Sequence, residues 1–207
     1  MATYASAAAR ILDSATKAGA DYADVAFWTI RTEGLFVRNG DVVNASDDRS
    51  LGYAVRALVA GSWGFYGSDR MADADLDRSA VAATAIARSG SKIADRIPAV
   101  TPTDKTIATW QTPFTKDPES VSLGERAAHL LGVEKSMHVA PNVAVGYAYM
   151  NLWTTSKEFY STTGSAIQQT LRQAGAGCGA SAIGKDKDAQ TRGGPGDFGL
   201  FQAAATK

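Results

Sequence analysis

The stretch that decides the fold reads SLGYAVRALVAGSWGFYGSD and covers residues 50–69 of a chain of 207 residues. Up to Val59, apolar residues alternate with small or polar ones, which is typical of a β-strand. Gly61 then predicts a turn, and residues 63–66 predict the strand that returns. We therefore expect two antiparallel strands, with Arg56 as a charged side chain inside an apolar run.

The residues before this stretch predict further strands of an antiparallel series. From Val25 to Ile30, apolar residues occupy both odd and even positions, which is typical of a strand buried on both faces. The dipeptide Asn39-Gly40 predicts a hairpin, because both residues tolerate the positive φ angles of a type I′ turn. Residues 35–38 and 41–45 are therefore expected to pair.

Helices are expected before and after this series. Residues 3–18 place apolar side chains on one helical face, and the helix is expected to stop at Gly19. Residues 71–90 begin with acidic side chains and carry a narrow face of small residues that would let a helix lie close to a sheet. This face consists of Leu76, Ala80, Ala83 and Ala87. Ser122 and Glu125 form an S-x-x-E capping box, which predicts the beginning of another helix.

The second half of the chain predicts a linker and a meander of strands. Four of the six prolines fall among threonines at 91–118, which is typical of an extended linker. The meander strands are expected at 142–153, 157–162 and 165–174. Past Gly175 the chain becomes polar and rich in glycine, and residues 192–199 are expected to form a loop.

Together these patterns predict an α+β protein with antiparallel sheets and flanking helices in two subdomains. The subdomains are expected at 1–90 and 119–207, joined by the Pro/Thr-rich linker at 91–118. Polar groups at 46–50 and 154–156 are expected to be turns that separate successive strands.

Composition argues against several classes of function. Lys plus Arg equals Asp plus Glu at 21 each, and no basic stripe is present, so a nucleic-acid partner is not expected. No apolar run approaches the ~20 residues that a membrane span requires, and the first residues lack the apolar core of a signal peptide. The single cysteine, Cys178, excludes internal disulfides and a multi-cysteine zinc site. We therefore expect a cytoplasmic protein with no nucleic-acid or membrane partner.

The chain has two histidines, and neither begins an H-E-x-x-H metal motif. His129 follows Glu125 at i, i+4, and His138 follows Glu134 at the same spacing. Such pairs are typical of contacts on a helix surface, so we interpret neither as a metal or catalytic site. Cys178 lies among small residues with no basic neighbour in sequence, and we interpret it as a packed thiol.

Arg56 is the residue whose role the sequence leaves open. It lies on a strand face made open by Gly52 and Ala54. One interpretation is an arginine at a solvated sheet face or in a structural ion pair. The other is an arginine that lines a groove and binds a carboxylate or a peptide carbonyl of a substrate. Trp63 and Phe65 are interpreted as core or interface anchors and not as platforms for a ligand.

Several segments, in their order and spacing, resemble the amino-terminal half of the TldD/PmbA family of metallopeptidases, also named modulators of DNA gyrase. They read GADYADVAFW, LFVRNGDV, SLGYAVRALVAGSWGFYGSD, DPESVSLGERAAHLL and STTGSAIQQ, and the likeness runs from about Asp13 to Asp197. The resemblance implies an α+β region with curved antiparallel sheets. It also implies a carboxy-terminal half whose H-E-x-x-x-H motif and later cysteine bind zinc, and this sequence ends at Lys207 before any such motif.

The resemblance implies no catalytic and no metal-binding residue in this chain, because no position matches the family's motif. Zinc is expected only in the missing carboxy-terminal half, whether the chain is a fragment, a stand-alone domain or the front of a longer protein. Family members form homodimers or heterodimers that enclose a cavity where peptides are cleaved. We therefore expect this chain to be a part of a peptidase that has no activity by itself. It is expected to line the substrate cavity and to support the dimer, with Arg56 as the candidate substrate contact. The alternative is a non-enzymatic partner-binding or regulatory module.

Overall fold

The computed structural model describes residues 4–93, 104–194 and 202–203. The helices of this part of the chain are α1 (Ala5–Lys17), α2 (Asp73–Ser91), the short 3-10 helix η1 (Pro118–Ser120) and α3 (Leu123–Ser136). The strands are β1 (Tyr22–Arg38), β2 (Asp41–Val59), β3 (Ser62–Ser68), β4 (Ile107–Gln111), β5 (Val143–Ser161), β6 (Ala166–Ile183), β7 (Ala189–Gly193) and β8 (Gln202–Ala203). Their order in the sheet is β3-β2-β1-β5-β6-β4, with β7 and β8 also paired to β6. The expected α+β class, with antiparallel strands and flanking helices, is confirmed.

The chain forms two compact units, each assembled from three segments. Unit 1 contains Met1–Thr29, Ser50–Trp110 and Thr155–Thr170, and unit 2 contains Ile30–Arg49, Gln111–Thr154 and Leu171–Lys207. Each of the long strands β1, β2, β5 and β6 therefore gives one part to each unit. The sequential domains 1–90 and 119–207 stay a prediction. Of the expected linker at 91–118, residues 94–103 lie outside the described residues, and its later part contains β4.

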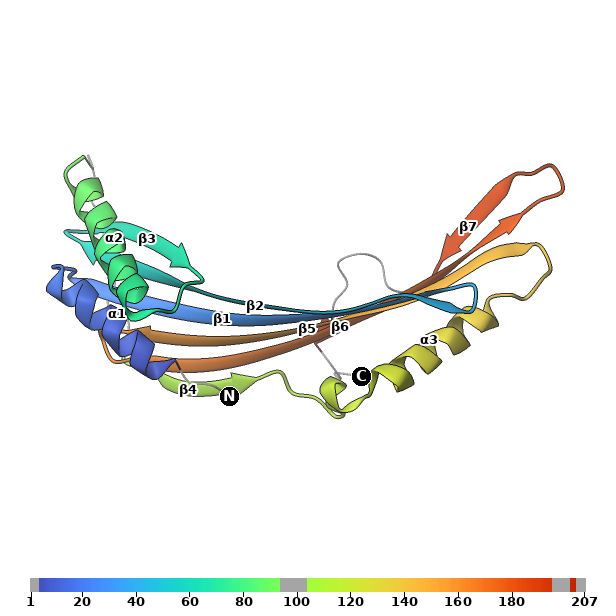
Figure 1. Ribbon diagram of the computed structural model, residues 1–207, viewed down its shortest axis with the longest axis horizontal. Coiled ribbons are helices and arrows are strands. Elements are labelled where there is room, and N and C mark those ends of the chain that lie inside the picture. The colour runs from blue at the N-terminus through green and yellow to red at the C-terminus, as the bar shows by residue number, and fades with distance from the viewer. Residues whose placement is uncertain (1–3, 94–103, 195–201, 204–207) are drawn as a thin grey trace. The chain divides into compact units, whose positions relative to one another are not determined.

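Helices α1 and α2 of unit 1 pack on one face of its strands (Figure 1). The core joins alternate residues of β1 and β2 to the apolar faces of both helices. Its buried residues are Ala8, Ile11, Ala15, Ala23, Val25, Phe27, Tyr53, Val55, Ala57, Leu76, Ala80 and Ala83. The expected burial of both strand faces from Val25 to Ile30 holds as far as Phe27, whereas Trp28 and Thr29 are half-buried and Ile30 is exposed. The small face of the second helix, from Leu76 to Ala87, is buried as expected.

Helix α2 lies directly on the backbone of β3 at Gly64. A Cβ atom at this position would come within 1.9 Å of the carbonyl oxygen of Ala83 and 2.6 Å of the amide nitrogen of Ala87. The strand therefore requires glycine here, and the alanines keep the facing helix surface low enough for the contact. The small face of α2 thus packs against strand backbone, with no side chain between them.

Strand β3 pairs with only part of β2. The antiparallel register runs from Tyr53 opposite Ser68 to Val59 opposite Ser62. Between the strands, Ala60 and Gly61 have φ angles of 47° and 79°, the positive values that a tight hairpin turn requires. The hairpin expected in residues 50–69 is confirmed, and the remainder of β2 toward its amino end extends past the end of β3.

Unit 2 has a smaller core beside α3. Its buried residues are Leu35, Val37, Leu130 and Ala148. Helix α3 begins at the predicted capping box: the Glu125 N–H donates to Ser122 Oγ at 3.2 Å, and the Ser122 N–H donates to Glu125 Oε2 at 2.9 Å. The Ser122 hydroxyl also donates to Glu125 Oε2, at 2.8 Å. The hydroxyl and N–H of Ser122 lower the pKa of the Glu125 carboxyl, because both donors favour its charged form.

The predicted Asn39-Gly40 turn is confirmed, with φ angles of 50° and 84°. The Asn39 side chain donates to the carbonyl oxygen of Ala144 at 3.2 Å and accepts from the N–H of Gly146 at 2.9 Å. The buried Glu134 of α3 accepts from the N–H of Gly40 at 3.1 Å. The turn is therefore held by β5 and α3 as well as by its own geometry.

Two predicted turns are wrong. Residues 46–50 lie inside β2 and residues 154–156 lie inside β5, so the strands expected on either side of each turn are continuous. From Asp41 to Leu51 every residue of β2 is exposed, so no alternation of apolar and polar residues marks the strand. Past Gly175, β6 continues to Ile183 and pairs with β7. Of the loop expected at 192–199, residues 195–199 lie outside the described residues, and the first two residues end β7.

Replacing Gly64 with alanine is expected to lower the free energy of unfolding by about 1–3 kcal/mol, because the new Cβ would overlap the backbone of α2. Gly67 of the same strand provides the control, since a Cβ there would meet its nearest atom at 3.7 Å, an ordinary contact. Gly67→Ala is expected to leave the stability unchanged or slightly raised. Urea unfolding measures both variants, and equal midpoints would contradict the close contact at Gly64.

Candidate functional site

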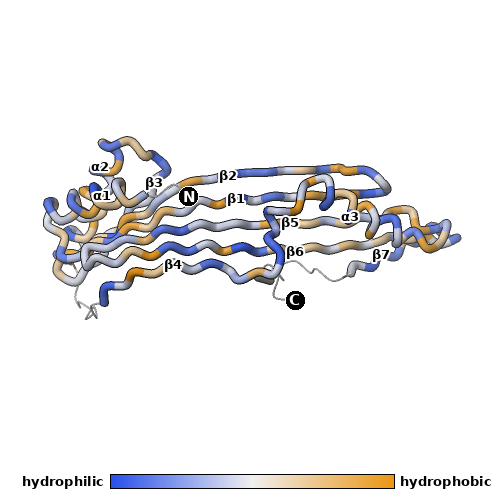
Figure 2. Tube along the Cα trace, turned by 90° about the horizontal axis from the view of Figure 1, so that it is seen from below, coloured by the Kyte–Doolittle hydropathy of each residue, from blue (hydrophilic) through white to orange (hydrophobic). Residues whose placement is uncertain are grey.

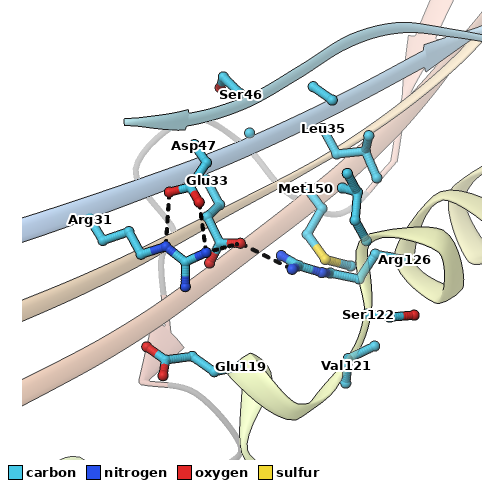
Figure 3. A pocket seen from close by; sticks show the side chains of 13 residues that line it. Arg31, Glu33, Leu35, Ser46, Asp47, Glu119, Val121, Ser122, Arg126 and Met150 are labelled. Carbon is cyan, nitrogen blue, oxygen red and sulfur yellow. Dashed lines mark hydrogen bonds and ion pairs between the residues drawn. The ribbon is translucent and has the colours of Figure 1, made fainter. Parts of the chain in front are cut away.

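Unit 2 contains a pocket of about 380 Å³ that we name the charged pocket (Figure 3). Its charged side chains are Arg31, Glu33, Asp47, Glu119 and Arg126, and Leu35 and Met150 contribute apolar surface. The charged residues come from β1, β2, η1 and α3. Because these elements are distant in sequence, only the folded chain assembles the pocket.

Arg31 and Asp47 form the strongest ion pair of the charged pocket. Arg31 Nε donates to Asp47 Oδ1 and Nη2 donates to Oδ2, both at 2.8 Å. The Arg31 guanidinium lowers the pKa of the Asp47 carboxyl, and the carboxylate in turn raises the pKa of Arg31. Asp47 is therefore ionised and weakly basic at neutral pH.

Glu33 connects this pair to helix α3. Its Oε1 accepts from Arg126 Nη2 at 3.0 Å and lies 3.2 Å from Arg31 Nη2. The side chains of Glu33 and Arg126 are each 12% exposed. The capping box at Ser122 positions Arg126, because it fixes the residue at which the helix begins.

The charged pocket is suited to binding a polar group. Each of its carboxylates already has a donor: Asp47 has Arg31, Glu33 has both arginines, and Glu119 accepts from the hydroxyl of Thr154 at 3.2 Å. Its lining contains neither histidine nor cysteine. The lining holds three carboxylates and two guanidinium groups, and Arg49 and Arg172 lie 3.9 Å from Asp47 and 4.0 Å from Glu119, so the pocket favours a polar guest.

A second pocket of unit 2, of about 410 Å³, has an aromatic lining, and we name it the aromatic pocket. Phe36 stacks on Tyr147 with ring centroids 6.0 Å apart, and Tyr149 belongs to the same lining. Both tyrosines lie against glycines of β6, since a Cβ at Gly179 or Gly177 would lie within 2.6 Å of Tyr147 or Tyr149. The glycines therefore let the rings lie flat on the sheet.

The structure places Arg56, the predicted substrate contact, in unit 1. Its Nε and Nη2 donate to the two carboxylate oxygens of Asp24 at 2.9 and 2.7 Å. Its guanidinium lies 5.3 Å from the ring centroid of Trp63, and Tyr22 donates to Asp24 at 3.0 Å. The Arg56 side chain is 53% exposed, whereas that of Asp24 is 3% exposed. A structural ion pair is therefore present, and the substrate-binding role of Arg56 stays a prediction.

The histidines and the cysteine are not brought together into a ligand set. His129 is exposed on α3, and Glu125, its expected contact, is used in the capping box instead. His138 Nε2 lies 2.5 Å from Glu134 Oε1, as its spacing predicts, and Cys178 packs beside the core of unit 2. Within residues 4–93 and 104–194, no group of three or more His, Cys, Asp or Glu side chains could hold a metal ion. No helix in these ranges is long and apolar enough to span a membrane.

Comparison with known proteins confirms the family resemblance. Residues 23–87 match domain 1 of the PmbA/TldA metallopeptidases. A metalloprotease of Methanothermobacter thermautotrophicus is 25% identical over 149 residues, which cover 72% of this chain and 31% of the relative.

Solved structures of low sequence identity share the fold. A proposed modulator of DNA gyrase from Bacteroides thetaiotaomicron has a TM-score of 0.69 at 12% identity, over 91% of this chain and 43% of its own. A similar protein from Thermotoga maritima has a TM-score of 0.68 at 14% identity, over 92% and 42%. TldE from Thermococcus kodakarensis has a TM-score of 0.62 at 13% identity, over 89% and 42%. The chain thus spans less than half the length of each of these relatives.

Replacing Arg56 with leucine is expected to lower the free energy of unfolding by about 1–3 kcal/mol, because the buried Asp24 carboxylate loses its ionic partner. The double variant Arg56→Leu/Asp24→Asn is expected to recover part of this loss, since the uncompensated charge is then removed. Urea unfolding of the three proteins measures the effect. An unchanged midpoint for Arg56→Leu would show that the ion pair does not support the fold.

Burial raises the pKa of Tyr22 to about 12, and the Asp24 carboxylate acts in the same direction. An unfolded tyrosine titrates near pH ~10, so the folded state holds this phenol proton more tightly. The resulting stability is complete below about pH 10 and is lost as the pH rises toward 12. An alkaline titration followed by ultraviolet absorbance is expected to show a late step that Tyr22→Phe removes. A curve of unchanged shape in that variant would refute the shift.

Proposed function

We propose that this chain is the amino-terminal part of a TldD/PmbA-family protein and forms the non-catalytic region of a zinc metallopeptidase. In this role it lines the cavity that receives peptides or small proteins and supports a homodimer or heterodimer. The observation that carries the proposal is the match of residues 23–87 to domain 1 of these metallopeptidases, together with the shared fold over 91% of the chain. A cytoplasmic location belongs to the same proposal.

The zinc ion of such an enzyme would be held outside this chain. The residues described here do not fit the metal: His138 is bound to Glu134, His129 is on an exposed surface and Cys178 is packed against the core. When bound by the H-E-x-x-x-H half, zinc supplies a Lewis acid and an activated water for peptide hydrolysis. The part left to this chain is to hold and orient the peptide.

Charged and aromatic surfaces support a role in holding peptides. The charged pocket presents Arg31 and Asp47 in fixed positions, and the aromatic pocket presents three rings. In unit 1, Arg56 is half exposed while its Nε and Nη2 hold Asp24, so its remaining N–H groups can donate to a peptide carbonyl. A rigid polar lining of this kind orients a flexible substrate at a low entropic cost.

A partner-binding module without peptidase function is the second candidate. It is favoured by the exposed aromatic side chains of β3, with Trp63 40% exposed and Phe65 61% exposed. Aromatic residues and arginine are enriched at the centres of protein interfaces, and Arg56 is paired across the strands with Phe65. The same surface could equally serve the dimer of the first proposal.

One experiment distinguishes the two candidate functions. This chain is purified alone and together with a TldD/PmbA chain that carries H-E-x-x-x-H. Alone, the chain is expected to contain no stoichiometric zinc and to cleave no unstructured peptide, because its ligands are not assembled. The complex is expected to bind zinc and to cleave the peptide until a chelator removes the metal. Metal analysis and mass spectrometry of the products are the measurements.

The matched control replaces the glutamate of the partner's H-E-x-x-x-H motif with glutamine. This change is expected to leave the complex intact and to abolish cleavage. One-to-one zinc and chelator-sensitive cleavage by this chain alone would contradict the proposal. A stable complex with an unrelated protein, and none with the peptidase chain, would establish the partner-binding module instead.

A further inference from the structure

Asn39 is the one asparagine of this chain that precedes a glycine, and it lies in the turn between β1 and β2. Asparagine followed by glycine is the pair most prone to spontaneous deamidation, because glycine has no side chain to hinder attack by its nitrogen on the asparagine amide. Both residues are exposed, and Figure 2 shows this tip of the hairpin largely in blue, the colour of hydrophilic residues. Water therefore reaches the turn, and the contacts of the turn decide whether it reacts.

Helix α3 holds the nitrogen that would attack. The N–H of Gly40 donates to Oε2 of Glu134 at 3.1 Å, and Oε1 of the same carboxylate lies 2.5 Å from Nε2 of His138. The Glu134 side chain is 2% exposed, so little water competes for these bonds. Gly146 of β5 lies close to the pair, since a Cβ there would come within 2.6 Å of Glu134 and 2.8 Å of His138. The Gly40 nitrogen is thus bound by a carboxylate whose own position is fixed.

Strand β5 holds the amide that would be attacked. Nδ2 of Asn39 donates to the carbonyl oxygen of Ala144 at 3.2 Å, and Oδ1 accepts from the N–H of Gly146 at 2.9 Å. The backbone N–H of Asn39 donates to the carbonyl oxygen of Gly146 at 3.0 Å. To bond to the Gly40 nitrogen, the side-chain carbon Cγ must turn away from β5, which breaks both side-chain bonds. The nucleophile and the electrophile are therefore held by different elements of unit 2.

We propose that Asn39 is a deamidation site that the contacts with α3 and β5 keep unreactive, so that the reaction follows local opening of the turn. In the open turn, hydroxide removes the Gly40 N–H proton, and the nitrogen forms a bond to Cγ of Asn39. The bond from Cγ to Nδ2 breaks, Nδ2 takes a proton from water and leaves as ammonia, and a five-membered imide remains. Water then adds to one of the imide carbonyls and opens the ring, which leaves aspartate or isoaspartate at position 39.

Either product weakens the contacts that prevented the reaction. A carboxylate at position 39 has no N–H to donate to the carbonyl oxygen of Ala144, and it adds a negative charge to the turn that the Glu134 carboxylate binds. Isoaspartate also adds a methylene group to the main chain, which disturbs the register of β1 and β2 at the turn. The reaction is therefore a permanent record of opening at this turn. The inference goes beyond the proposed function, because its reactants are water and the chain itself.

The proposal is tested by incubating the 207-residue chain at neutral pH and mapping its peptides by mass spectrometry, with chromatography to separate aspartate from isoaspartate. The native chain is expected to deamidate at Asn39 at least about tenfold more slowly than the same chain unfolded in urea, because the reaction requires the open turn. Asn44 and Asn142 are exposed but precede residues that carry a side chain. They are internal controls and are expected to react slowly in both states.

The role of the helix is tested with Glu134→Ala, which frees the N–H of Gly40. The folded variant is expected to deamidate at Asn39 at least about tenfold faster than the unmodified chain, because a charged acceptor of the turn is lost. Lys135→Ala changes an exposed neighbour on the same helix and is expected to leave the rate unchanged. Circular dichroism shows whether each variant folds. If Glu134→Ala does not, His138→Ala is measured instead, with a smaller increase expected because the carboxylate keeps its bond to Gly40.

Equal rates in the native and the urea-unfolded chain would overturn the proposal, as would an unchanged rate in a folded Glu134→Ala variant. A slower reaction in that variant would also overturn it, because Glu134 would then act as a base on the Gly40 nitrogen. Reaction at Asn44 or Asn142 as fast as at Asn39 would overturn the choice of site. None of these rates depends on assembly with the H-E-x-x-x-H chain, so the proposed function is tested separately.

Discussion

The contact between α2 and the backbone of β3 at Gly64 is the constraint on which the arrangement of unit 1 depends. It places helix backbone against strand backbone, so the helix can follow β3 after a short connection and fold back onto it. Strand β3 therefore ends at Ser68 and reaches only as far as Tyr53 on its neighbour. Beyond that point β2 continues, and β1 is its only paired neighbour among the described residues.

Local signals in the sequence predict most of the fold. Asn39-Gly40 and the capping box at Ser122 are correct because each depends on a few neighbouring residues. Residues 46–50 are mistaken for a turn because a strand exposed on both faces has no apolar alternation. The same error hides the charged pocket. A turn at residues 46–50 would take Asp47 out of the sheet, where it is the partner of Arg31. The pocket depends on register between distant segments, which no single stretch of sequence encodes.

The two units hold their charged side chains in different ways. In unit 1, Arg56 is held by a buried carboxylate and covers an aromatic ring, so its position is fixed while part of its guanidinium faces solvent. In unit 2, Arg31 lowers the pKa of Asp47 and keeps this carboxylate ionised, and Glu33 is paired with Arg126. Paired charges of this kind bind and orient polar groups. They are consistent with a chain that contributes to peptide hydrolysis by holding the substrate while another region supplies the metal.

Hydrogen exchange along β2 tests this account most directly. In the free chain, residues 53–59 are expected to exchange slowly throughout, because β2 is paired on both sides there. Between residues 41 and 51, fast and slow amides are expected to alternate, since only one side is paired. Amides that are uniformly slow between residues 41 and 51 would contradict the account.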